Sequence, residues 1–208
     1  MNKLKFTLDK KKSLCLISDN LPLKEVYICY FLEMYWCEDE KNIIIGKNDA
    51  GGFLEKFKLL LPLALEQKLM LDESIKKNLG YYWNEIFADR KSFVNLVYKH
   101  ASDGKYTYWI GMNYFMASTC APHDPVVTTW MYNDTNGDII LEITERFTWS
   151  EQEIASPEEM DRYFAFLKNY KPILKQVIPQ KVAEQWLKKA KKWYKIFYDN
   201  EQKACGRQ

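Results

Sequence analysis

The sequence predicts an α+β fold in which helices pack on an antiparallel sheet and a helical segment forms the C-terminus. Apolar residues alternate with polar ones in the first 45 residues and again between Tyr106 and Trp149, as in strands with one buried face. They recur every three or four residues from Phe53 to Ala64 and from Met160 to Phe197, as on the buried side of helices. With 208 residues, 47% of them hydrophobic, the chain is long enough to bury a full core.

The chain opens with a predicted β-hairpin. Three apolar residues between positions 4 and 8 alternate with polar ones, and the segment DKKKS turns the chain into a second apolar run, 14–17. The next segment, 26–36, is dense in aromatic and β-branched residues, and its even-numbered positions are all apolar. This pattern favours a strand but leaves a helix open. The acidic segment CEDE (37–40) predicts a turn before a short strand, NIII.

The period changes after the glycine-containing segment GKNDAGG (46–52), which lacks the spacing of a phosphate-binding loop. An apolar residue at every third or fourth position predicts a helix over 53–64. Pro62 should kink or divide this helix, because proline lacks an amide hydrogen and clashes with the preceding turn.

A second group of helices is predicted to follow. Asp72 is placed to cap a short helix that Gly80 would end. The segments YYWNEIF (81–87) and SFVNLVY (92–98) should continue the helical layer. Asp103-Gly104 then predicts a turn into the next strand.

The middle of the chain is the clearest β region. Alternating apolar residues predict one strand over 106–116. The segments 126–132 and 139–149 predict a hairpin, whose turn NDTNGD contains an Asn136-Gly137 pair that tolerates positive φ. On the second strand of this hairpin, Glu145 is the only charged residue on an otherwise apolar face.

The C-terminal third is predicted to be helical. Ser156-Pro157-Glu158-Glu159 combines a serine N-cap, a proline at the first helical position and a glutamate placed to close a capping box. A short segment then lies between Pro172 and Pro179, before a long last helix. The predicted inward residues are Met160, Phe164 and Leu167 on the first helix, and Val182, Trp186, Ala190, Trp193 and Phe197 on the last.

The sequence contains no predicted linker, targeting segment or membrane span. We expect one domain over 1–199 and a flexible tail over 200–208. The N-terminal charges are not followed by the apolar run of a secretory signal, and the longest uncharged stretch, 106–123, contains polar residues and proline. Five cysteines, at positions 15, 29, 37, 120 and 205, lack the spacing of a disulfide framework. These features predict a cytoplasmic protein with reduced thiols.

The segment TCAPHDP (119–125) places Cys120, His123 and Asp124 within five positions. A Cys–His catalytic pair normally comes from distant segments, whereas neighbours held between prolines point in different directions. The only other histidine is His100, and no cysteine pair has the spacing of a structural zinc site. The segment is therefore predicted to be a rigid turn, and the chain to hold no metal and no cofactor.

Charge is strongly segregated along the sequence, although the formal net charge is only +2. Lys171 to Lys195 contains eight lysines and one acid, whereas Asp138 to Asp161 contains eight acids and one arginine. Four further acids lie between Glu33 and Glu40. On the last helix the tryptophans fall on the inward stripe, so the lysines predict a plain solvated face rather than a nucleic-acid site. The acidic segments, which adjoin aromatic residues, suit docking of a basic protein partner.

Two segments, WMYNDTNGDIILEITERFTW (130–149) and FLKNYKPILKQVIPQKVAEQW (166–186), are similar to small bacterial proteins of the toxin-immunity type. Such proteins accompany polymorphic or contact-dependent growth-inhibition toxins. The resemblance covers the C-terminal third to half of the chain and lies in texture rather than in an invariant motif, so it carries over no functional residue. It implies a non-enzymatic, cytoplasmic protein that binds and occludes a toxin domain.

We therefore predict a bacterial immunity protein that neutralises a basic, nuclease-like toxin through an acidic and aromatic surface, with no role for a membrane or nucleic acid. The predicted contact residues are Glu38, Asp39, Glu40, Glu142, Glu145, Trp149, Glu151 and Glu153. Two alternatives stay open. One is a small hydrolase that uses Glu145, or Cys120 with His123. The other is a nucleic-acid-binding protein that uses the lysine-rich C-terminal helix.

Overall fold

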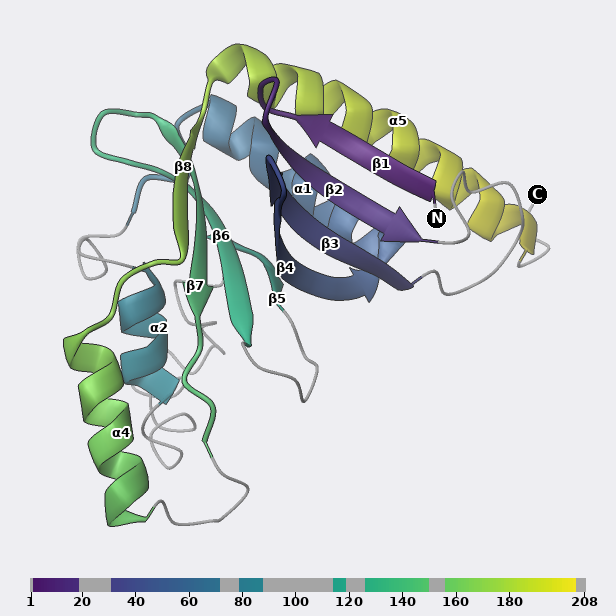
Figure 1. Cartoon of the computed structure of the whole chain (residues 1–208). Helices are drawn as coiled ribbons and strands as arrows, with labels where there is room; N and C mark the ends of the chain where they lie inside the picture. The colour runs from purple at the N-terminus through teal and green to yellow at the C-terminus, as the bar shows by residue number, and fades with distance from the viewer. Residues whose placement is uncertain are drawn as a thin grey trace, which may run out of the picture.

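The computed structural model describes residues 2–18, 31–71, 79–87, 114–118, 126–149 and 156–204. Within these residues the chain forms two antiparallel four-stranded sheets and four helices (Figure 1). The protein is therefore α+β, as predicted, but its strands are divided between two sheets. A long C-terminal helix, α5 (Gln180–Ala204), runs along one side of the molecule.

The first sheet joins its strands in chain order, β1-β2-β3-β4. The strands are β1 (Asn2–Thr7), β2 (Lys12–Ser18), β3 (Phe31–Glu38) and β4 (Lys41–Asp49). The predicted opening hairpin is confirmed. The turn predicted over 37–40 is shorter, since Cys37 and Glu38 end β3 and only Asp39 and Glu40 form the turn. The segment 26–36 is a strand from Phe31 onward, and its first residues lie outside the described part. Alternation buries Leu32, Met34 and Trp36 on one face of β3, as the pattern predicts.

Helix α1 (Ala50–Leu65) follows β4 and packs along α5. Pro62 lies inside α1 but does not divide it, and the helix ends three residues later at Leu65. Phe57 of α1 stacks on Trp186 of α5, with ring centroids 5.7 Å apart, and meets Phe6 of β1 edge-on at 5.1 Å. These three rings join both helices to the first sheet.

The second sheet has the order β5-β6-β7-β8. Its strands are β5 (Phe115–Ser118), β6 (Val127–Asn133), β7 (Ile139–Glu145) and β8 (Leu174–Ile178). The predicted β6–β7 hairpin is confirmed, and Gly137 in its turn has a φ of 83° that suits glycine. The two sheets share one core, in which β4 lies against β5 and β6.

Strand β8 corrects the sequence analysis, which assigns the whole C-terminal third to helices. The segment between Pro172 and Pro179 pairs with β7 instead. Five residues are too few to distinguish a two-residue from a three- to four-residue period. The flanking prolines and Lys175 are features that protect an exposed sheet edge from further pairing.

Two helices, α2 (Leu79–Phe87) and α4 (Pro157–Lys168), lie near the far end of the second sheet (Figure 1). Residues 81–87 are helical as predicted, but Gly80 lies in the first turn of α2 and does not end a helix. A Cβ at Gly80 would lie 1.9 Å from Tyr170 Oη and 2.3 Å from Thr144 Cγ2, so close packing requires glycine here. Ser156 caps α4 as predicted, since its Oγ accepts a hydrogen bond from the Glu159 amide at 3.2 Å.

Several other predictions concern segments that lie at or beyond the ends of the described ranges. Helix α5 continues through Ala204, past position 200 where the tail was predicted to begin. The cap at Asp72, the helix over 92–98, the turn at 103–104 and most of the strand over 106–116 lie outside the described part. None of the described helices is long and apolar enough to cross a membrane.

Candidate functional site

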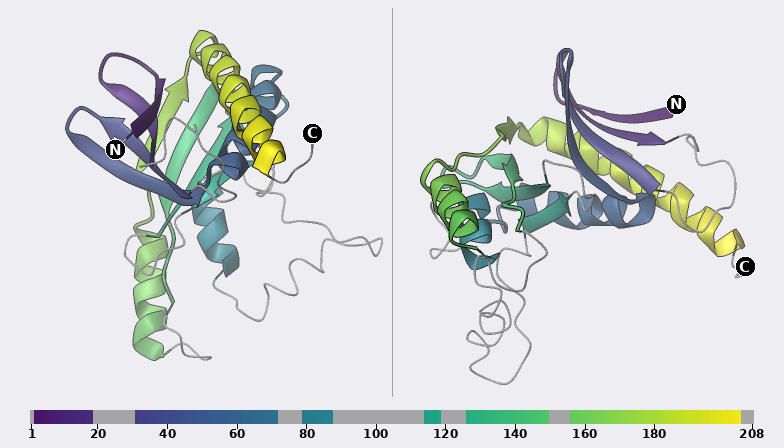
Figure 2. Two further views of the ribbon diagram at one scale, coloured as in Figure 1. Left: turned by 90° about the vertical axis from the view of Figure 1, so that its right-hand side faces the viewer. Right: turned by 60° about the horizontal axis from the view of Figure 1, so that its bottom comes forward.

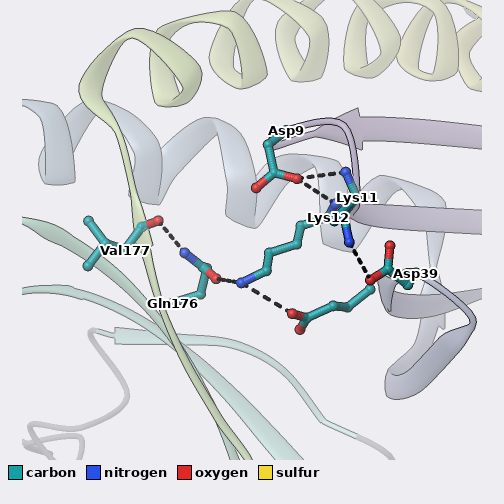
Figure 3. Close-up of polar contacts among 7 residues, drawn as sticks. Asp9, Lys11, Lys12, Asp39, Gln176 and Val177 are labelled. Atoms are coloured by element: carbon teal, nitrogen blue, oxygen red, sulfur yellow. Dashed lines mark hydrogen bonds and ion pairs between the residues drawn. The ribbon is translucent and has the colours of Figure 1, made fainter.

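The predicted acidic residues Glu38, Asp39 and Glu40 lie at the exposed turn between β3 and β4. Asp39 adopts a positive φ of 50°, which aspartate tolerates better than most residues. The tip of the β1–β2 hairpin lies beside this turn. Lys11 Nζ is 3.3 Å from Asp39 Oδ2, as Figure 3 shows, and Lys12 Nζ is 3.3 Å from Glu38 Oε1.

The lysine tip is held in place by its own contacts. The Asp9 carboxylate accepts hydrogen bonds from the amides of Lys11 and Lys12 at 2.7 and 2.8 Å, and these bonds lower the pKa of Asp9. Lys12 also donates to Gln176 of β8 at 3.0 Å, which links the two sheets (Figure 3). Cations therefore face two of the three carboxylates of the turn. A basic partner meets a weaker field here than the sequence alone predicts.

Glu142 is buried on β7, with 2% of its surface exposed. Tyr132 Oη donates a hydrogen bond to Glu142 Oε2 at 2.6 Å, and Lys175 is its cross-strand neighbour on β8. Burial raises the pKa of Glu142, against smaller opposing effects of the Tyr132 hydrogen bond, the Lys175 charge and the Gly80 amide. The prediction that Glu142 belongs to an exposed acidic surface is wrong, because both faces of β7 are covered.

Glu145, by contrast, is exposed where β7 ends. It borders a groove of about 600 Å³ between the end of β7 and α4. The other described residues that line this groove are Arg162, Ala165, Phe166, Asn169, Tyr170, Lys171, Pro172 and Ile173. None of these lining residues is a serine, threonine, cysteine or histidine that would act as nucleophile or base beside the carboxylate. The groove presents a carboxylate, a guanidinium, an ammonium and an amide to a partner.

Aromatic rings join the segment after β7 to α4. The centroids of Phe147 and Trp149 lie 4.8 Å apart, and Trp149 lies 4.8 Å from Tyr163 of α4. Tyr163 also meets Phe147 edge-on at 5.3 Å. Trp149, a predicted contact residue, is therefore half-buried as a support for α4 and only partly available to a partner.

A buried amide fixes this aromatic cluster. Asn84 of α2 donates hydrogen bonds to the carbonyls of Gly80 and Glu145 at 2.8 and 2.9 Å, and its Oδ1 accepts one from the Phe147 amide at 2.7 Å. Tyr163 Oη in turn donates to the Asn84 carbonyl at 3.2 Å. Burial raises the pKa of Tyr163 to about 12, so its hydroxyl remains a donor near neutral pH. Sequence reasoning missed Asn84, because nothing local signals partners 60 residues away.

Helix α4 turns Phe164 toward solvent, with 57% of its surface exposed. Met160, Phe164 and Leu167 were predicted to face inward, but the buried residues are Glu159 and Tyr163. The buried side is rotated by about one residue, or 100°, because Tyr163 is the ring that packs on Phe147 and Trp149.

Carboxylates accompany Phe164 on the exposed side of α4. Glu158 and Asp161 precede it and are both exposed, whereas Lys168 and Lys171 follow at the other end of the helix. The acidic character is therefore confined to the N-terminal half of α4. We call Glu158, Asp161 and Phe164, together with Glu145 at the groove, the α4 surface. Figure 2 shows that α4 extends away from the first sheet. The four residues of the α4 surface are all exposed.

Glu151, Glu153, Cys120 and His123 lie outside the described part of the chain. Within the described part, no three His, Cys, Asp or Glu residues converge as metal ligands.

Comparisons with protein-family models, with curated proteins and with solved structures found no match. Fold and site together define an α+β protein with a ring-supported, partly acidic surface on α4.

Proposed function

We propose that this chain is a non-enzymatic bacterial binding protein, an immunity protein that neutralises a basic toxin domain in the cytoplasm by docking it on the α4 surface. The observation that carries the proposal is the exposure of Phe164, 57%, on a helix whose opposite side is fixed by the contacts of Tyr163 with Phe147 and Trp149. An aromatic side chain that fills a pocket of the partner can act as a binding hot spot.

The support matters because it lowers the cost of binding. Tyr163 and Asn84 tie α4 to α2 and β7, so the backbone that carries Phe164 is already ordered before a partner arrives. Little conformational entropy is then lost on association, and more of the contact energy appears as affinity. A partner pocket that encloses the ring would remove its exposed apolar surface from water.

The charges near Phe164 favour a basic partner. Glu158 and Asp161 precede the ring on the exposed side of α4, and Glu145 lies at the neighbouring groove. Exposed carboxylates of this kind contribute mainly by speeding encounter with a positively charged surface, and salt screens that effect. A nuclease-like toxin, whose own substrate is a polyanion, has such a surface. Occluding it would block the toxin without any reaction catalysed by this chain.

Binding to the toxin domain encoded by the adjacent gene tests the proposal, with affinity measured by calorimetry and association rate by stopped-flow fluorescence. Phe164→Ala should weaken binding by at least about 2 kcal/mol, a factor of roughly 30. Tyr198→Ala is the matched control, because Tyr198 is a similarly exposed ring, 46%, on α5. Equal losses of affinity in both variants would refute the proposed surface. No binding by the unaltered chain would refute the proposed function.

The electrostatic part is tested separately. E158K/D161K should slow association about tenfold at low ionic strength and have little effect at high ionic strength. E55K/E184K makes the same change in net charge on exposed residues of other helices and should leave the association rate nearly unchanged. If both double variants slow association equally, only net charge matters and the α4 surface is not the docking site.

A further inference from the structure

Helix α5 and strand β1 form a second charged surface, at the opposite end of the molecule from α4 (Figure 1). Trp186 of α5 donates to the Thr7 carbonyl at 2.8 Å, and Lys189 donates to the Lys5 carbonyl, so the helix is fixed along the edge strand. The Lys189 ammonium also lies 5.6 Å from the centre of the Phe6 ring. These contacts set two rows of lysines side by side, one on each element.

The row on α5 follows the solvent side of the helix. Ala183, Trp186, Ala190 and Phe197 are buried on the opposite side. The exposed lysines of the two elements, which we call the basic face, are Lys3, Lys5, Lys181, Lys188, Lys191, Lys192 and Lys195. At a rise of about 1.5 Å per residue, the row from Lys181 to Lys195 extends about 21 Å.

No carboxylate of the described part of the chain pairs with these ammonium groups, although Lys3 donates to Cys37 Sγ of β3 at 3.7 Å. There, ion pairs to carboxylates hold Lys11, Lys12, Lys47 and Lys68, but no lysine of the basic face lies within 4.0 Å of a carboxylate oxygen. Glu184, the one acid among the lysines of this helix up to Lys195, lies beyond that distance from all of them. Among the described residues, the charge of the basic face is therefore left unpaired by carboxylates.

We propose that the basic face binds the phosphate backbone of double-stranded nucleic acid without sequence preference, a property independent of the proposed immunity function. A duplex presents one phosphate per strand every 3.4 Å along its axis, so a 21 Å row of lysines spans the axial length of about six phosphates of each strand. The face contains lysine only, and lysine contacts to phosphate carry no sequence information.

Two other anionic partners fit less well. Single strands are held by stacking of successive bases on a series of rings, but Trp186 is buried and Trp193 is half-buried against the core. The exposed ring Tyr198 lies three residues beyond Lys195, past the end of the lysine row. A membrane surface is bound by helices that insert an apolar side, and the apolar side of α5 is packed against β1 and α1. A duplex backbone needs neither feature, which is why the structure favours it.

Fluorescence anisotropy with a short labelled DNA duplex tests this inference between about 50 and 200 mM NaCl. If about five of the lysines each neutralise one phosphate, the plot of log affinity against log salt has a slope of about −4.5. K188Q/K192Q/K195Q should reduce the size of that slope by about 2.7, since each lost phosphate contact contributes about 0.9. The same triple variant should weaken binding at least about tenfold at the lowest salt concentration.

The control removes three lysines from other surfaces. K47Q/K68Q/K168Q changes net charge equally but leaves the basic face intact, so it should keep the slope of the unaltered protein. Circular dichroism confirms that both triple variants fold. A slope near zero in the unaltered protein, or equal losses in both triple variants, would overturn the inference. So would tighter binding to single-stranded DNA, or to vesicles rich in phosphatidylserine, than to the duplex.

Discussion

Replacement of the buried Glu142 by glutamine tests whether burial outweighs the neighbouring groups in setting the pKa of this carboxyl. Burial raises the pKa of Glu142 above its ordinary value of 4.5, while Tyr132, Lys175 and Gly80 act in the opposite direction. The sign of the net effect decides how stability depends on pH. A raised pKa means that the folded chain holds this proton more tightly than the unfolded chain does.

The consequence has a definite pH window. Below about pH 4.5 the carboxyl is protonated in both states and folding carries no penalty from it. As pH rises from there to the folded pKa, stability is lost at up to about 1.4 kcal/mol per pH unit, the limit for one proton. Glutamine is neutral throughout and still offers Tyr132 a carbonyl acceptor. Glu142→Gln should therefore be more stable than the unaltered protein at neutral pH, by about 1.4 kcal/mol for each unit of the pKa shift.

Urea denaturation of both proteins between about pH 4 and 8, followed by circular dichroism, measures this difference. The advantage of Glu142→Gln should grow with pH and then become constant. Glu145→Gln, a substitution on the same strand at an exposed carboxylate, should change stability by less than about 0.5 kcal/mol. An advantage that shrinks as pH rises would show that Tyr132 and Lys175 outweigh burial, and would refute the reasoning.

Other substitutions test the packing around the same sheet. Asn84→Ala leaves the Glu145 carbonyl and the Phe147 amide without their side-chain partner. The substitution should therefore lower the free energy of unfolding by about 3 kcal/mol in urea denaturation, and a loss below about 0.5 kcal/mol would contradict this expectation. Gly80→Ala should destabilise by about 1–3 kcal/mol despite the better helix propensity of alanine, and Tyr170→Phe should restore part of the loss by removing the closest atom. Cys15 and Cys37 are buried free thiols, so in the folded protein they should react with iodoacetamide at least about 100-fold more slowly than in urea. Mass spectrometry of a C29S/C120S/C205S variant measures both rates, and equal rates would refute their burial.

Local patterns predicted which segments become strands and helices better than they predicted which side is buried. The alternation of β3 and of the β6–β7 hairpin is a property of neighbouring residues, so the sequence shows it directly. The inward side of α4 is not a property of neighbouring residues, because Tyr163 is buried by Phe147 and Trp149, which follow β7. The burial of Glu142 and the position of Gly80 within α2 were predicted wrongly for the same reason. Each is defined by α2 or Tyr170 packing on β7, a contact between segments more than 25 residues apart.

The same distinction decides how charge should be interpreted. Acidic and basic runs are separate along the chain, yet the fold places Lys11 and Lys12 against Asp39 and Glu38, and so cancels much of one predicted acidic surface. On α5 no such pairing occurs among the described residues, because β1, the strand beside it, contributes Lys3 and Lys5 rather than carboxylates. A run of charge is therefore available to a partner only when the elements that pack beside it leave it unpaired. By that criterion the acidic half of α4 and the lysine rows of α5 and β1 remain, and the acidic turn between β3 and β4 does not.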